Sequence, residues 1–217
     1  IFHPKMLPQI AILDPSLTIN LPKGITAGTG MDALAHCIEA YSSPFYHPMA
    51  EGTAVEGLRL VKENIQEVYH NGTNIEARAH MLVASMMGAA AFQKGLGAIH
   101  SITHPVNSLY HTHHGTTNGT VMPFVLNFNR SVIEKKFDRL ANFLNISNGF
   151  EGIVSWIIDL KKEMEIPETL KDMGVNSGDE IKLAPLAQED PSTGGNPLEM
   201  DENKFEKLIG NCIEGNY

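Results

Sequence analysis

Cysteine is scarce in this sequence, and the two cysteines that occur lie far apart. Cys37 and Cys212 are separated by most of the chain, and neither belongs to a Cys-x-x-Cys pair. Two isolated cysteines provide neither a disulfide framework nor a cysteine-based metal site. The sequence therefore favours a reducing compartment, and we expect a cytoplasmic protein.

An excess of positive charge and long apolar runs are also missing. The 16 Lys and Arg residues are outnumbered by 25 Asp and Glu residues, which gives a formal net charge of -9 over 217 residues. Such an acidic chain is a poor partner for a nucleic-acid backbone or an anionic membrane surface. No apolar segment is long enough to cross a bilayer, and no signal peptide opens the sequence. We therefore expect no nucleic-acid partner and no membrane association.

Helical patterns dominate the sequence from Met31 onward. Residues 9–14 predict a short buried strand, and a turn-rich stretch with several glycines follows it. Thr29 is then expected to cap the first helix. Helices are expected over residues 32–41, 50–69 and 75–92. The near absence of charge over residues 81–92 predicts that the third helix is buried on most sides.

Two later segments show the spacing of one apolar helix face. These apolar positions are Ile153, Ile157, Leu160 and Met164 in the first segment, and Phe205, Leu208, Ile209 and Cys212 in the second. Alternating, strand-like patterns are rare after the opening residues, and no repeat period is visible. The sequence thus predicts an all-α domain with one short strand at its front.

Histidine is the residue type in excess, with ten in the chain. Asp32 and His36 are four residues apart on a predicted helix, so their side chains project from one face within reach of one ion. That spacing is common by chance, and a second cluster carries more weight. It contains His100, His104, His111, His113 and His114. The alternative is a surface loop with incidental histidines, but the apolar neighbours Leu96 and Ile99 argue for partial burial.

A site drawn from Asp32, His36, His100 and His114 would present three nitrogen atoms and one carboxylate oxygen. This donor set suits Fe2+ or Zn2+ and is too rich in nitrogen for Mg2+ or Ca2+. A coordination position left open would make the ion a Lewis acid. The affinity order of divalent metals favours zinc over ferrous iron, so the residues alone leave the metal undecided.

Two segments resemble the metal motifs of the iron-containing alcohol dehydrogenases. Residues 29–41 (Thr-Gly-Met-Asp-Ala-Leu-Ala-His-Cys-Ile-Glu-Ala-Tyr) are similar to the first motif. Residues 95–105 (Gly-Leu-Gly-Ala-Ile-His-Ser-Ile-Thr-His-Pro), with the later pair His114-Gly115, are similar to the second. The resemblance extends to residues 14–18, which look like the family's crossing between domains, and to residues 189–197, which look like its late loop. It covers essentially the whole chain.

The resemblance implies a fold, a ligand set and a reaction. It implies that residues 1–25 are the last strand and crossing from a nucleotide-binding domain, and that residues 26–217 are the helical, metal-binding catalytic domain. The implied metal ligands are Asp32, His36, His100 and His114. His104 would line the cleft beside the nicotinamide, with a role in proton relay, and Leu17 would touch the dinucleotide.

The implied activity is hydride transfer between a small alcohol or aldehyde and NAD or NADP, with the metal coordinating the substrate oxygen. One departure from the family is large. Its first half carries a Gly-rich phosphate-binding loop, and no segment here is similar to that loop or to a G-x-G-x-x-G fingerprint. The nucleotide-binding half is therefore expected to be mostly missing from this sequence.

Two other functions stay open at this point. One is a truncated metal-binding fragment without catalysis of its own, and the other is a metal-dependent lyase or hydrolase of related architecture. No His-Asp dipeptide occurs, which argues against His-Asp phosphohydrolases. The resemblance also implies a homo-oligomer, a dimer or larger.

Overall fold

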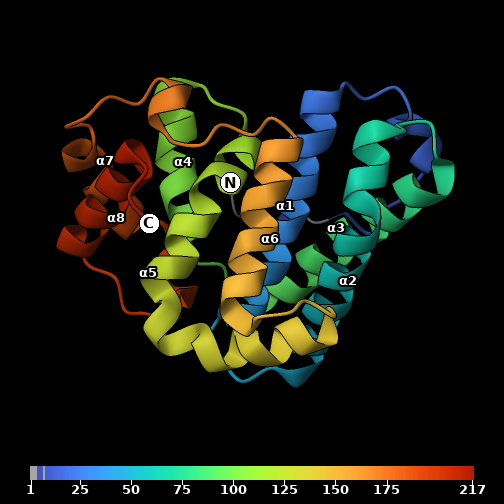
Figure 1. The fold of residues 1–217 in the computed structure, drawn as a ribbon, viewed down its shortest axis with the longest axis horizontal. Coiled ribbons are helices and arrows are strands. Elements are labelled where there is room, and N and C mark those ends of the chain that lie inside the picture. Colours follow the sequence, from blue (N-terminus) through green and yellow to red (C-terminus); the bar gives the residue numbers. More distant parts are fainter. Residues whose placement is uncertain (1–3, 7) are drawn as a thin grey trace.

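The computed structural model describes residues 4–6 and 8–217, and all regular structure within them is helical (Figure 1). The α-helices are α1 (Lys23–Ser42), α2 (Pro48–His70), α3 (Ile75–Ala91), α4 (Ala98–Tyr110), α5 (His114–Phe143), α6 (Gly149–Glu163), α7 (Glu180–Glu189) and α8 (Glu202–Glu214). Short 3-10 helices are η1 (Pro4–Met6), η2 (Pro15–Thr18), η3 (Phe92–Lys94), η4 (Lys171–Met173) and η5 (Pro191–Gly195). The all-α prediction is confirmed.

The short strand predicted over residues 9–14 is absent. This segment has no regular structure, and the side chains of Ile10 and Ile12 are 80% and 86% exposed. A strand is held by backbone hydrogen bonds to a neighbouring strand, and no other described segment is extended beside this one. Residues 1–3 and 7 of the predicted leading segment lie outside the described residues.

The first long helix, α1, begins at Lys23, well before the predicted start at residue 32. Thr29 does not cap it but donates its hydroxyl to the carbonyl of Ile25 within the helix. Gly28 and Gly30, two of the glycines that suggested turns, are buried helical positions. A Cβ on Gly28 would lie 2.6 Å from the ring of His113, and one on Gly30 would lie 2.9 Å from Ile65. These glycines therefore permit close packing of neighbouring helices rather than a turn.

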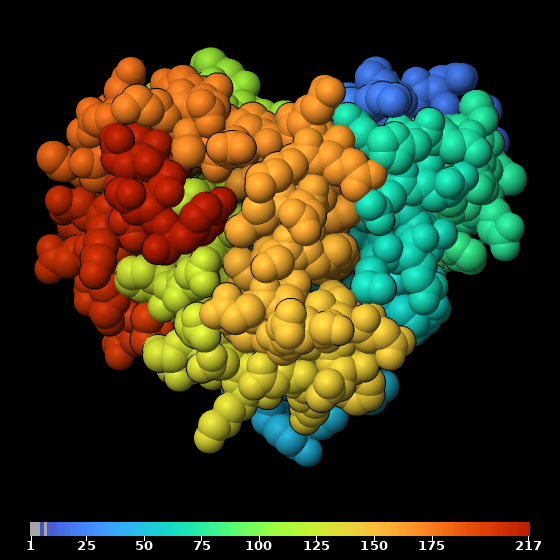
Figure 2. Space-filling model, viewed as in Figure 1, coloured from blue at the N-terminus to red at the C-terminus, as the bar shows by residue number. Residues whose placement is uncertain are grey.

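Helices α1 and α5 form the centre of the molecule. Helix α1 packs against α2, α3 and α5, and α5 packs in turn against α4, α6 and α8 (Figure 1). On the face shown in Figure 2, α6 lies between the teal helices α2 and α3 and the red helix α8. The core contains fully buried side chains from both central helices, including Met31, Leu34 and Ile38 of α1 and Phe137 of α5. The apolar faces predicted for residues 153–164 and 205–212 are buried in α6, its C-cap residue and α8.

Helix α3 is less buried than predicted. Of its charge-poor second half, Ala84, Gly88 and Ala91 are buried, whereas Met86 is exposed. Alanine and methionine are good helix formers, so an uncharged run of them is not in itself a sign of burial. The prediction that α3 is buried on most sides was wrong, because burial was inferred from the lack of charged residues alone.

No single helix in the described part of the chain is long and apolar enough to cross a membrane. One pair, residues 75–94 and 98–110, reaches the length and apolarity of a span only when both halves are counted across a 108° bend.

Candidate metal centre

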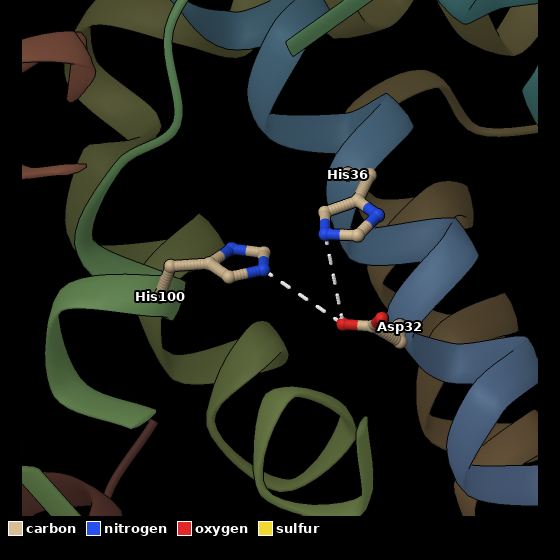
Figure 3. Close-up of side chains that lie close together, drawn as sticks. All are labelled: Asp32, His36 and His100. Carbon is tan, nitrogen blue, oxygen red and sulfur yellow. Dashed lines mark ion pairs between the residues drawn. The ribbon is translucent and has the colours of Figure 1, made fainter. Parts of the chain in front are cut away.

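Four predicted ligand residues come together from three helices. Asp32 and His36 lie one turn apart on α1, His100 lies in the first turn of α4, and His114 is the first residue of α5. The Nε2 atoms of His36, His100 and His114 lie 3.8, 3.8 and 3.4 Å from the same carboxylate oxygen, Oδ1 of Asp32. Figure 3 shows the ring nitrogens of His36 and His100 turned toward that oxygen.

These separations fit a first-row metal ion. Metal–nitrogen and metal–oxygen bonds of about 2.1 Å place tetrahedral ligand atoms about 3.4 Å apart. The three separations from Asp32 Oδ1 equal or slightly exceed that value. The rings of His36 and His100 are stacked, with centroids 4.9 Å apart. The ligand atoms of Asp32, His36 and His100 all lie within 4.8 Å of one another, so these three side chains can hold one ion, and His114 approaches the same carboxylate oxygen.

The outer nitrogens of two candidate ligand histidines are held by side chains that sequence reasoning missed. Glu39 Oε2 lies 2.6 Å from Nδ1 of His100, and Asn107 Oδ1 lies 3.1 Å from Nδ1 of His114. An acceptor at Nδ1 fixes the ring orientation and leaves Nε2 free to bind a metal. Glu39 follows Asp32 by seven residues on α1, and this same-face spacing is the signal that could have found it. The buried Nδ1 of His36 has no such partner in the described residues.

The N-terminus of α4 is held by side chains from distant segments. Backbone N–H groups at a helix start lack partners within the helix. Here Glu39 Oε1 accepts from Ile99 N at 2.7 Å, and Asn196 Oδ1 accepts from Ala98 N at 3.2 Å. Glu39 therefore binds both the N-terminus of α4 and the ring of His100, which lies in the first turn of that helix. It is buried with 4% of its surface exposed, so its position is fixed by these two contacts.

Asn118 is a further side chain at the centre of the cluster that the sequence analysis did not identify. It lies one turn after His114 on α5 and is fully buried. Its Nδ2 donates to Asp32 Oδ1 at 2.7 Å and lies 3.2 Å from Nε2 of both His100 and His114. The spacing of four residues from His114 was the available signal. Asn118 thus joins the carboxylate of α1 to the histidines of α4 and α5.

The electrostatics of the cluster favour a cation. Burial acts to raise the pKa of Asp32, but hydrogen bonds to His100 and His114 hold that pKa well below its usual range. Burial lowers the pKa of His36 to about 4, so this ring is a neutral nitrogen donor. For His100, burial is outweighed by the charges of Glu39 and Asp32, which raise its pKa to about 9. Two carboxylates therefore attract positive charge into the cluster.

His104, predicted beside the cofactor, lies at the edge of the cluster. Its ring stacks on His114 with centroids 5.5 Å apart and meets His100 edge-on at 5.8 Å. Its Nδ1 lies 2.7 Å from Oδ2 of Asp190, in the late loop that the sequence analysis singled out. The His104 side chain is 42% exposed, whereas that of the candidate ligand His100 is 2% exposed. His104 and His114, whose side chain is 39% exposed, are therefore the histidines of the group that solvent reaches.

The remaining predicted residues lie apart from the cluster. Leu17 is 80% exposed on η2, which packs against α3 rather than against a helix that carries the cluster residues. The next residue, Thr18, lines a cavity of about 250 Å³ together with Arg78 and Met81. Of the other histidines near the second motif, His111 ends α4 in a left-handed conformation, and His113 caps α5.

Comparison with known proteins places the chain in a family. Residues 26–213 match the model of the Fe-containing alcohol dehydrogenase family, C-terminal. The chain is 38% identical to 4-hydroxybutyrate dehydrogenase of Cupriavidus necator over 94% of its own length and 56% of that protein. It is 35% identical to NAD-dependent methanol dehydrogenase of Bacillus methanolicus, over 96% and 57%.

A solved structure gives the same result. The chain superposes on 1,3-propanediol oxidoreductase with a TM-score of 0.91 and 32% identity, covering 95% of this chain and 56% of that one. The chain thus spans about half the length of the relatives that it matches. The match of sequence and of fold over nearly all of its residues means that the chain belongs to the Fe-containing alcohol dehydrogenase family and contains that family's C-terminal, helical domain.

Proposed function

We propose that this domain supplies the metal centre for hydride transfer between a small alcohol or aldehyde and NAD or NADP. The observation that carries the proposal is the approach of three histidine Nε2 atoms to one oxygen of Asp32, at 3.4 to 3.8 Å. Asp32, His36, His100 and His114 would hold Fe2+, the metal in the family's name, or Zn2+, which suits the same donors. When bound, the cation supplies Lewis-acid stabilisation of the charge that develops on the alcohol oxygen.

The chain's own residues position the reaction and move the proton. Glu39 and Asn107 hold the outer nitrogens of His100 and His114, so the inner nitrogens stay directed at the ion. As the substrate carbon gives its hydride to the nicotinamide, the hydroxyl proton must leave. His104 Nε2 would accept this proton and pass it to solvent, which the exposure of the side chain allows.

The nucleotide part of the reaction is proposed for the whole protein rather than for this domain alone. The domain spans about half of its relatives, and its sequence contains no Gly-rich phosphate loop. We propose that residues 1–25 lead from a nucleotide-binding domain and that Leu17 and His104 contact the dinucleotide. Similarity to a 4-hydroxybutyrate dehydrogenase and a methanol dehydrogenase supports small alcohols and hydroxy acids as substrates. The two cysteines are free and buried, which fits a cytoplasmic location. We also propose that the whole protein forms a homo-oligomer.

The proposal is tested by metal content and turnover measured together. We expect the protein to hold one Fe2+ or Zn2+ per chain by elemental analysis. Asp32→Ala and His114→Ala should each lose most of that metal, because each removes one of four donors. Turnover is followed by NAD(P)H absorbance with methanol, 1,3-propanediol and 4-hydroxybutyrate, and it should be lost with the metal.

His70→Ala is the matched control, since His70 is exposed, pairs with Glu163 and lies far from the cluster in sequence. It should keep both metal and turnover. Full metal occupancy in folded Asp32→Ala would contradict the ligand assignment. The protein with all its domains could also retain the metal but show no nucleotide-dependent turnover. That result would instead favour a metal-dependent lyase or hydrolase.

A further inference from the structure

His104 and Asp190 form a carboxylate–imidazole pair next to the metal cluster. The two residues lie on α4 and at the start of the late loop, 86 residues apart, and their side chains meet at 2.7 Å. Among residues 4–6 and 8–217, only the Nδ1 side of the His104 ring has a hydrogen-bond partner. The ring stacks on His114 and meets His100 edge-on.

The oxygens of Asp190 have separate, fixed partners. Oδ1 accepts from Ser192 N at 2.8 Å and so caps η5, while Oδ2 faces Nδ1 of His104. Both oxygens are therefore acceptors, and a carboxylate is the side chain that can serve both at once. The carboxylate is well buried, with 11% of the side chain exposed, whereas the imidazole remains open to solvent.

The loop that carries Asp190 is tied to the helices of the site. Thr193 donates its hydroxyl to Ala187 O at 2.7 Å and lies 2.8 Å from the hydroxyl of Ser101 on α4. Farther along, the buried Asn196 exchanges two hydrogen bonds with Asn129 of α5, at 2.9 and 3.0 Å. These bonds fix the carboxylate relative to α4, so the pair is not an accidental surface contact.

We propose that Asp190 is a positioning residue that fixes the tautomer of His104. Because Oδ2 can only accept, Nδ1 carries the hydrogen and Nε2 keeps its lone pair. The chemical consequence rests on the proposed function: an Nε2 lone pair is what a proton acceptor beside the substrate hydroxyl requires. The tautomer itself does not depend on that function and can be observed without turnover.

Asp190→Asn tests the proposal without deleting the side chain. The amide oxygen should keep the cap on Ser192, because a backbone N–H needs an acceptor there. The NH2 group would then face His104, and Nδ1 would have to accept, which moves the hydrogen to Nε2. The readout is the pair of ring 15N chemical shifts of His104 in the zinc-loaded protein, which is diamagnetic. Spectra are taken well above the ordinary pKa of imidazole, and the resonance is assigned with His104→Gln.

The expected result is a protonated Nδ1 in the wild type and a protonated Nε2 in Asp190→Asn. The matched control is Asp201→Asn, since Asp201 caps α8 by accepting from Lys204 N but faces no histidine in the described part of the chain. It should leave His104 unchanged. An unchanged His104 tautomer in Asp190→Asn, or a protonated Nε2 in the wild type, would overturn the proposal. Asp190→Ala provides a second variant in which the preference for Nδ1–H should disappear.

Kinetics then separate this inference from the proposed function. If His104 relays the proton, Asp190→Asn should lower kcat on the order of 100-fold, with a much smaller change in KM for the alcohol. A tautomer change without any change in kcat would keep Asp190 as the positioning residue and remove the relay role from His104. Metal content should stay at the wild-type level in either case, because neither residue supplies a cluster donor.

Discussion

At the scale of single residues, the site contains two carboxylates with different tasks. Asp32 presents an oxygen to the three histidine nitrogens and is partly reached by solvent. Glu39 is buried and contacts His100 only from the outer side of the ring. A buried carboxylate without a cation is costly unless hydrogen bonds satisfy it, and Glu39 has an acceptor bond on each oxygen. Its role is therefore to orient His100 and to add negative charge behind it.

Replacing Glu39 by Gln should weaken metal binding without removing a ligand. The substitution removes the negative charge. The new NH2 group must then face either Nδ1 of His100 or the N–H of Ile99, so one of the two present contacts is lost. We expect metal affinity to fall on the order of 10- to 100-fold, measured by competition with a chelator and with folding checked by circular dichroism. Glu163→Gln is the matched control, because Glu163 also lies 2.6 Å from a histidine, His70, but at the surface. Equal affinities in Glu39→Gln and wild type would contradict the role given to Glu39.

At the scale of helices, the class of structure and the four cluster residues could be predicted from the sequence, but not the start of α1 or the exposure of much of α3. The ligand spacing was readable because Asp32 and His36 share one helix face and the motifs are local. The start of α1 was missed because Gly28 and Gly30 serve contacts with distant residues, which no local pattern records. Glu39 was missed for the same reason, since its partners Ile99 and His100 lie about sixty residues away. Nonlocal contacts thus account for the errors at the start of α1 and at Glu39.

The crossing of α1 and α5 gives a prediction at this scale. Gly115 lies so close to α1 that a Cβ would be 2.0 Å from the carbonyl oxygen of Gly28 and 3.0 Å from Cβ of Asp32. Backbone cannot yield as a flexible side chain does, so Gly115→Ala should push the helices apart. We expect a loss in unfolding free energy of about 1–3 kcal/mol or more, measured by urea denaturation. Metal content should fall too, because Asp32 and His114 lie on opposite sides of the crossing.

A second glycine serves as the control for this change. Gly52, in α2, has no atom within 4 Å of the position of an added Cβ. Gly52→Ala should therefore leave the metal in place and raise the unfolding free energy by about 0.5–1 kcal/mol, as expected for a helical glycine. Wild-type stability and metal content in Gly115→Ala would mean that the helix crossing is looser than the structure has it.

At the scale of the whole molecule, buried cations join the helices of an otherwise acidic protein. Lys94 donates to Ala40 O and Ser43 O at the end of α1, at 3.0 and 2.6 Å, and also contacts Glu51. Carbonyl groups at a helix end lack partners and carry partial negative charge, which a cation satisfies. Lys161 of α6 also donates to backbone carbonyls, that of Thr120 within α5 and that of Glu168 in the connection after α6. Such ties hold the bundle that positions the metal cluster.

Lys161 makes the stability of the whole domain depend on pH in a defined direction. Burial lowers its pKa from 10.5 to about 8, while its Nζ donates to Thr120 O at 3.0 Å and Glu168 O at 3.2 Å. Between these pH values the unfolded chain holds a proton that the folded protein has released. Unfolding free energy therefore rises with pH across this window, by up to about 1.4 kcal/mol per pH unit from this group.

The comparison with Lys161→Met isolates this contribution. The buried thiols act in the opposite sense above pH 9, since burial raises the pKa of Cys37 to about 12 and that of Cys212 as well. Because wild type and variant share both thiols and the metal cluster, those contributions cancel in the difference of their unfolding free energies. That difference, from urea denaturation at pH values between about 7 and 10, should shift in favour of the wild type as pH rises above about 8. Parallel curves for the two proteins would show that Lys161 keeps its proton on folding, held by its two carbonyl partners, and that burial does not control its charge.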